Sequence, residues 1–318
     1  EVLIGAGSGV LALVLIILGF SVSGSPINNN ANPQPSDSNS VSSSATPTDS
    51  ATAGARTCSI ASLATDPKLG NFSGVFLNAT TSEVLFDRSK DVPAATASTL
   101  KLLTAAAALQ VLGPNYRVET KVYQDPTNPG SIYLVGAGDP TLSRTANGKQ
   151  SVYQNAPKLS DLAVGVNAKL GATPITKITL DSTLFAGPTW DTTWERTEQT
   201  QGFMSEVTAL QVDGDRANPA AETSARSTTP VANAGKYFKT ALGASASGAS
   251  IVQGKMPAGM TQIASVLSQP INVWVRHMLL VSDNTEAEYL ARLVSLQEGF
   301  DGSFASLNVA IKQALAYT

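Results

Sequence analysis

Hydrophobic and polar positions divide the chain into three parts. Residues 2–20 form a run without a charged side chain, and residues 21–57 are rich in Ser, Asn, Pro and Thr without an aromatic residue. From residue 58 onward, short alternating runs and longer apolar runs follow one another to the end of the chain. This order predicts a hydrophobic helix, a disordered linker and then a folded region of mixed helices and strands.

The uncharged run has the length of a membrane-spanning helix, which needs about 20 residues. The apolar core of a cleaved signal peptide is shorter, roughly 7 to 15 residues, and no A-x-A cleavage site follows closely. We therefore favour residues 1–20 as an uncleaved anchor, with a cleaved signal as the alternative. Residues 21–57 cannot bury enough apolar surface to offset their ordering entropy, so they are expected to tether the folded part to the membrane.

The folded region contains sequence patterns that are typical of helices and of strands. Residues 73–79 and 82–88 alternate on either side of two threonines and predict a β-hairpin. Residues 98–112 predict a helix, which Gly113 and Pro114 end. Further strands are expected at 116–125, 131–140 and 175–185, further helices at 159–171, 234–246 and 302–318, and two helices within 271–299 that break at Ser282-Asp283-Asn284.

The composition of the chain argues against several classes of function. The net charge is -3, and no block of like charges suggests a nucleic-acid partner. Cys58 is the single cysteine and His277 the single histidine, which nearly excludes a zinc site of the His/Cys type and weakens a Ser-His-Asp triad. Any nucleophilic chemistry here is expected to use a base other than histidine.

Ser98 and Lys101 are the candidate nucleophile and base. Residues three apart share one face of a helix, so the two side chains are expected to be neighbours. Ser98 lies near the predicted helix start, where free N–H groups and the helix dipole favour an alkoxide or an oxyanion. Lys101 must be uncharged to take a proton, and the apolar residues that follow it favour a buried helix that would lower its pKa. The alternative is a capping serine beside a solvated lysine.

Ser282-Asp283-Asn284 is the second candidate, at the break between two helices. A serine there could relay a proton to a leaving group, and the amide of Asn284 could hold a substrate carbonyl or the lysine. A cap of the following helix is the alternative for Ser282, which Glu286 partly supports. The same S-x-N pattern at residues 306–308 falls in mid-helix and is interpreted as coincidence.

S-x-x-K together with S-D-N resembles penicillin-binding proteins and class A β-lactamases. Residues 73–113 look like the hairpin and nucleophile helix of D-alanyl-D-alanine carboxypeptidases, and residues 134–144, 178–190 and 278–292 are similar to the class C carboxypeptidase/endopeptidases with inserted domains. Ser282 follows Ser98 by 184 residues, far more than a β-lactamase has between its motifs. The resemblance therefore implies an α/β (α+β) transpeptidase fold split by a β-rich insertion.

The implied organisation has five segments. They are an anchor or signal at 1–20, a linker at 21–57, a first catalytic part at 58–128, an insertion at roughly 129–265 and a second catalytic part at 266–318. The implied location is a membrane-anchored protein with its catalytic part in the cell envelope, outside the cytoplasm.

The resemblance also assigns roles. Ser98 is expected to be acylated by the D-Ala-D-Ala peptide of peptidoglycan or by β-lactams, with Lys101 as base, Ser282 and Asn284 as second motif, and no cofactor or metal. Asp139 of the G-D-P-T-L stretch is expected to bind the stem peptide, with a turn role before Pro140 as its alternative.

One family motif, K-T-G, is absent. Residues 239–241 read K-T-A, but they precede the S-D-N motif and fall in a predicted helix. The chain begins without Met and only 34 residues follow Asn284, so we expect a fragment of a longer protein. A β-lactamase and a catalytically silent wall-binding protein on the same fold remain alternative functions.

Overall fold

The computed structural model describes residues 60–316, which divide into two units between Ser89 and Lys90. The predicted anchor and linker, residues 1–57, lie outside the described residues. Among the helices of residues 60–316, none combines the length and the apolar character that crossing a membrane requires.

The described part of the first unit is a short helical segment followed by a hairpin. Strands β1 (Gly74–Leu77) and β2 (Val84–Arg88) pair antiparallel, which confirms the predicted hairpin. Asn78 shapes the turn, because its side-chain oxygen accepts the N–H groups of Thr80 and Thr81. Before the hairpin lie α2 (Ala61–Ala64) and a 3-10 turn, η1 (Pro67–Leu69).

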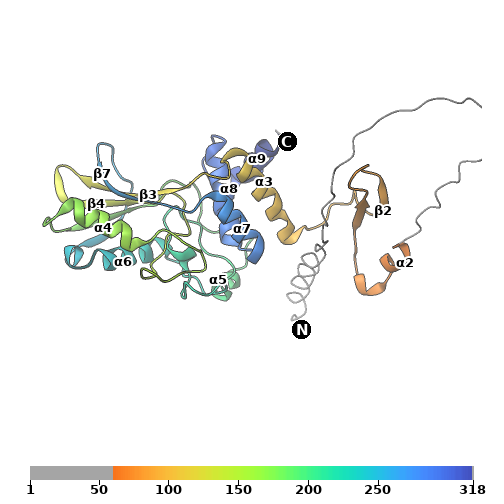
Figure 1. Cartoon of the computed structure of the whole chain (residues 1–318), viewed down its shortest axis with the longest axis horizontal. Coiled ribbons are helices and arrows are strands. Elements are labelled where there is room, and N and C mark those ends of the chain that lie inside the picture. The colour runs from red at the N-terminus through yellow and green to blue at the C-terminus, as the bar shows by residue number, and fades with distance from the viewer. Residues whose placement is uncertain (1–59, 317–318) are drawn as a thin grey trace, which may run out of the picture. The chain divides into compact units, whose positions relative to one another are not determined.

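A five-stranded mixed sheet forms one half of the second unit (Figure 1). Its strand order is β6-β5-β4-β3-β7, with β3 antiparallel to β4 and β7, and β5 parallel to β4 and β6. The strands are β3 (Glu119–Asp125), β4 (Asn128–Val135), β5 (Lys177–Asp181), β6 (Ser250–Gln253) and β7 (Thr261–Leu267). The strands at β3, β4 and β5 were predicted, whereas β6 and β7 were missed.

Two amphipathic helices pack side by side against this sheet and close the first core. Helix α4 (Leu159–Leu170) contacts β7, and α6 (Pro230–Leu242) contacts β5 and β6. Pro230 occupies the first turn of α6, where the missing N–H of a proline has no helical partner to lose. Residues 239–241, the K-T-A sequence, lie inside α6 as predicted.

Four helices form the other half of the second unit and enclose a second core around Trp274 and Tyr289 (Figure 1). They are α3 (Lys101–Val111), α7 (Ile271–Val281), α8 (Asn284–Gln297) and α9 (Phe304–Leu315), and α3 contacts the other three. The short helices α5 (Thr197–Gln201), η3 (Asp213–Asp215) and η4 (Gly243–Ala246) lie on the connections.

Helix α3 is less buried than its sequence predicted. Ala105, Ala107 and Ala108 are buried, because small side chains let the neighbouring helices approach closely. Leu102 and Leu103 stay 58% and 48% exposed. The expectation of burial on nearly all faces was therefore wrong, although Lys101 itself is buried.

The five strands of the large sheet all lie between Ser98 and Ser282 in sequence. Strand β3 lies just before the predicted insertion at residues 129–265 and β7 crosses its end, yet both belong to the same sheet as β4, β5 and β6. The segment boundaries at 129 and 265 stay a prediction.

Candidate active site

Ser98 and Lys101 meet at the start of α3. Ser98 lies in a 3-10 turn, η2 (Ala97–Leu100), and α3 begins at Lys101. The Lys101 Nζ atom is 3.0 Å from Ser98 Oγ, which confirms the predicted proximity. Ala97, directly before Ser98, has a positive φ of 47°, a strained conformation that surrounding structure must maintain.

The S-D-N segment completes the cluster from the opposite side. It connects α7 to α8, at the predicted helix break. The Lys101 Nζ atom lies 3.3 Å from Ser282 Oγ and 2.6 Å from Asn284 Oδ1. The hydroxyl oxygens of Ser282 and Ser98 are 2.8 Å apart. One amine therefore contacts two hydroxyls and one amide, in an arrangement through which a proton can pass.

The cap of α8 is Asp283, not Ser282. The Asp283 Oδ1 atom accepts the backbone N–H of Glu286 at 3.0 Å. The Ser282 hydroxyl, free of that capping bond, faces Ser98 and Lys101. The alternative interpretation of Ser282 as the N-cap of the following helix was therefore wrong.

Lys101 has the environment that a lysine base needs. Its side chain is 8% exposed, and burial lowers its pKa from 10.5, against the opposing charges of Asp283 and Glu288. A lowered pKa increases the share of uncharged amine at neutral pH, and only the uncharged form can accept a proton from Ser98.

A cavity of about 500 Å³ opens beside the cluster. Ser98, Lys101 and Asn284 line it, together with Trp194 and Met204. Three acidic residues also contribute to the wall: Glu195, Glu198 and Glu288. Burial raises the pKa of Glu288 to about 7, so part of its population is uncharged at neutral pH. The cavity is large enough to hold part of a peptide next to the Ser98 hydroxyl.

Asp139 lies elsewhere in the second unit. Its carboxylate is buried, and Oδ1 accepts from the N–H and the hydroxyl of Thr141 at 2.7 and 2.6 Å. Burial raises its pKa to about 6. Asp139 is not among the residues that line the cavity, and its contacts are those of a turn residue. Its predicted role in substrate binding stays a prediction that this geometry does not support.

The second S-x-N pattern is structural. Ser306 lies inside α9, and its hydroxyl bonds to the carbonyl of Ser303 and to the hydroxyl of Ser295. Its interpretation as a coincidence is consistent with these contacts.

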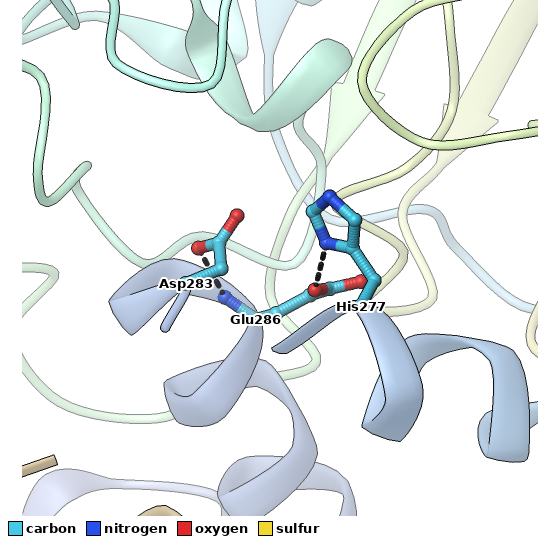
Figure 2. A group of neighbouring side chains, drawn as sticks. All are labelled: His277, Asp283 and Glu286. Atoms are coloured by element: carbon cyan, nitrogen blue, oxygen red, sulfur yellow. Dashed lines mark hydrogen bonds and ion pairs between the residues drawn. The ribbon is translucent and has the colours of Figure 1, made fainter. Parts of the chain in front are cut away.

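A charge network that sequence analysis missed lies next to the S-D-N turn (Figure 2). His277 Nδ1 and Glu286 Oε2 are 2.6 Å apart, and Arg216 pairs with Asp283 at 2.7 Å. The ligand atoms of His277, Asp283 and Glu286 lie within 4.8 Å of one another, a spacing that a metal ion could use. The Arg216 guanidinium already supplies positive charge to Asp283, so we interpret the group as a hydrogen-bonded charge network. No local sequence pattern predicts this charge network, because Arg216 and Asp283 are 67 residues apart in sequence.

Comparison with known proteins places the chain in a family. The profile of the D-Ala-D-Ala carboxypeptidase 3 (S13) family matches residues 56–227 and 214–318. The chain belongs to this family. It is similar to Carboxypeptidase Rv3627c of Mycobacterium tuberculosis, with 36% identity over 265 residues, which cover 83% of this chain and 57% of that protein. It is also similar to Carboxypeptidase DacB of Mycolicibacterium smegmatis, with 35% identity over 79% of this chain and 54% of that protein.

A solved protein structure has a similar fold. Penicillin binding protein 4 of Haemophilus influenzae superposes with a TM-score of 0.63 at 18% sequence identity, covering 77% of this chain and 67% of that one. This similarity confirms the α+β fold of penicillin-binding proteins. The chain spans a little over half the length of the two mycobacterial relatives.

Proposed function

We propose that this chain carries the nucleophile and base of a serine-type D-Ala-D-Ala carboxypeptidase/endopeptidase that acts on peptidoglycan stem peptides. The observation that carries the proposal is the position of Lys101 Nζ within 3.3 Å of Ser98, Ser282 and Asn284 side-chain oxygens. Family membership supports the same reaction class.

The first half of the reaction is acylation. Uncharged Lys101 accepts the proton of the Ser98 hydroxyl while the serine oxygen attacks the carbonyl carbon of the D-Ala-D-Ala peptide bond. The tetrahedral intermediate then collapses, the C–N bond breaks, and the departing amine takes a proton from Lys101 through the Ser282 hydroxyl. The products are free D-Ala and an ester between Ser98 and the shortened peptide.

The second half is hydrolysis. Lys101 accepts a proton from a water molecule, whose oxygen attacks the ester carbonyl, and Ser98 leaves with its proton restored. Asn284 Oδ1 lies 2.6 Å from the lysine amine and is expected to orient it in both halves of the reaction. Cross-bridge cleavage is the same chemistry with a different departing amine. β-Lactams acylate Ser98 in the same way, and hydrolysis of the resulting ester is expected to be slow.

We propose further that residues 129–265 are an insertion that splits the catalytic part, and that residues 1–20 hold the protein at a membrane with the catalytic part outside the cytoplasm. The strands between the two motifs support the insertion. The uncharged run at residues 2–20 supports the membrane attachment.

Covalent labelling of the full-length protein with a fluorescent penicillin tests the proposed activity. We expect the wild-type protein and the Cys58→Ala variant to be labelled and the Ser98→Ala variant to lose the label. Cys58→Ala is the matched control, because it removes the single thiol of the chain. Label that persists in Ser98→Ala, or its absence from the wild-type protein, contradicts the proposal.

A further inference from the structure

The backbone of Ser282 needs support from its surroundings. Ser282 ends α7 in the left-handed conformation, with φ 59° and ψ 41°. A residue with a Cβ atom adopts this conformation at a cost in free energy, and it persists where neighbouring contacts fix the chain. Both Ser282 and Asn284 reach Lys101 from this one short turn, so whatever holds the turn controls the geometry of the cluster.

Asp283 fixes the turn between α7 and α8 through its side chain. Its side chain is 3% exposed, and both carboxylate oxygens are used. Oδ1 caps α8 through the N–H of Glu286, while Oδ2 accepts from Arg216 at 2.7 Å and from the Tyr153 hydroxyl at 3.3 Å. The carboxylate therefore connects the beginning of α8 to two side chains that come from between the catalytic motifs.

Arg216 is itself rigidly placed. Its side chain is 2% exposed and donates to the Tyr153 hydroxyl at 2.6 Å and to the Glu222 carbonyl at 3.2 Å. Its guanidinium also stacks on the Tyr153 ring, with 4.8 Å from Cζ to the ring centroid. A planar, always charged guanidinium with several fixed bonds is suited to orienting a carboxylate.

The segment before Arg216 has an unusual backbone. Asp213, Gly214 and Asp215 all have positive φ, of 53°, 57° and 55°. Asp213 is held by Arg144, whose Nη1 lies 2.8 Å from Asp213 Oδ2. This left-handed turn is thus fixed by its own ion pair, and it directs Arg216 toward Asp283.

His277 and Glu286 support the same turn from the helices on either side of it (Figure 2). His277 lies near the end of α7 and Glu286 in the first turn of α8, and their 2.6 Å contact bridges the two helices across Ser282. The His277 ring also packs edge-on against Tyr153, with centroids 5.2 Å apart.

Resting on the proposed function, we propose that Arg216 is a positioning residue for acylation. Its guanidinium fixes Asp283, and through Asp283 it fixes the turn that presents Ser282 and Asn284 to Lys101. The region between the two motifs, which contributes Arg216, is then required for the chemistry at Ser98 itself.

Charge balance near the lysine supports this role. Burial lowers the pKa of Lys101, and the charges of Asp283, which caps α8, and of Glu288, within α8, raise it. Its other neighbours, Ser98, Ser282 and Asn284, are neutral. Arg216 offsets the negative charge of Asp283, so its loss is expected to raise the pKa of Lys101 and to leave less uncharged base at neutral pH.

The test compares acylation kinetics of full-length variants by a fluorescent penicillin. For Arg216→Met we expect the maximal acylation rate to fall by about 100-fold, the size of effect that a displacement of roughly 1 Å can cause. The half-saturating penicillin concentration is expected to change little, and the pH at which acylation is half-maximal is expected to rise. Arg216→Lys, which keeps the charge, should recover part of the rate.

Arg196→Met is the matched control, since it also removes an arginine from an ion pair, and the partners of Arg196 are Glu206 and Gln199 rather than Asp283 or the left-handed turn. Measured under conditions in which both proteins are folded, its acylation rate is expected to stay within about threefold of wild type, because sites that share no partner act nearly independently. Equal rates for Arg216→Met and Arg196→Met would overturn the inference. Failure of the wild-type protein to be acylated would instead contradict the proposed function.

Tyr153→Phe provides a second test of the inference in case Arg216→Met does not fold. This variant retains the ring beneath Arg216 and removes the hydroxyl that Arg216 and Asp283 share. We expect about a fivefold slower acylation, corresponding to one lost hydrogen bond. Wild-type acylation kinetics in Tyr153→Phe, measured on folded protein, would overturn the inference.

Discussion

The Lys101 Nζ atom lies 2.6 Å from Asn284 Oδ1, although 183 residues separate the two in sequence. An uncharged amine needs a partner that fixes its direction without adding charge, and a carboxamide oxygen is such a partner. The same contact ties the start of α3 to the start of α8 and keeps Ser98 and Ser282 within 2.8 Å of each other.

Acylation should depend on pH through Lys101. Because burial lowers the pKa of Lys101 from 10.5, the acylation rate is expected to rise with pH and to reach its plateau with a midpoint below 10.5. Lys101→Arg, which keeps a permanent charge, should lower the rate by about 10³-fold. Stopped-flow acylation from about pH 6 to about pH 11 checks both outcomes, and a midpoint at or above 10.5 would contradict a lowered pKa.

Ser282→Ala should slow acylation by about 10² to 10⁴-fold, because the variant removes the hydroxyl that passes the proton to the departing amine. The chain offers a matched control in Ser306→Ala, which removes the serine of the second S-x-N pattern inside α9. That control should keep the wild-type acylation rate. The relay assignment fails if the two variants acylate at the same rate as each other.

Substitutions at Asp139 separate a turn role from substrate binding. Asp139→Asn keeps an acceptor for Thr141 and should change neither the stability nor the KM for a stem peptide by much. Asp139→Ala leaves the Thr141 donors without their partner and should lower the free energy of unfolding by about 1 to 3 kcal/mol. Urea unfolding and steady-state kinetics give both quantities. A tenfold higher KM in folded Asp139→Asn would instead support the predicted contact with substrate.

Stability should fall as pH rises past neutrality because of His277 and Glu286. Burial lowers the pKa of His277, but the hydrogen bond and charge of Glu286 outweigh it and raise the pKa from 6.5 to about 9. A group with a raised pKa stabilises the folded state fully below its unfolded value of 6.5, and this contribution is lost as pH rises through about 9.

His277→Gln should therefore flatten the dependence of unfolding free energy on pH. We expect about 1 to 2 kcal/mol of the wild-type decline between pH 6.5 and about 9 to disappear, a range that allows for solvent screening of the partly exposed ring. Urea unfolding at about pH 6, 7.5 and 9 measures it. A decline of the same size in the variant would show that this pair does not set the pH dependence.

Local sequence was informative where partners are close along the chain. The spacing of Ser98 and Lys101 predicted their contact, and the S-D-N break between two apolar runs predicted the turn between α7 and α8. The hairpin of β1 and β2 was also readable, because its alternating runs and short turn adjoin one another.

Contacts between residues that are far apart in sequence could not be predicted from local sequence patterns. Arg216 and Tyr153 reach Asp283 from 67 and 130 residues away, and each looks like an ordinary residue of its own segment. The exposed leucines of α3 show the same limit, because an apolar run indicates which side chains can be buried and not how many faces other helices cover. Edge strand β6 was missed because it pairs only with β5, which lies far earlier in the sequence, so no adjoining hairpin turn indicates it.

The most direct test of the central claim is to identify the acylated residue. The full-length protein is incubated with benzylpenicillin, digested, and analysed by peptide mass spectrometry. If Ser98 is the nucleophile, one penicilloyl group is expected on Ser98 and none on Ser282 or Cys58. An adduct on any other residue, or none under conditions in which the protein is folded, would contradict it.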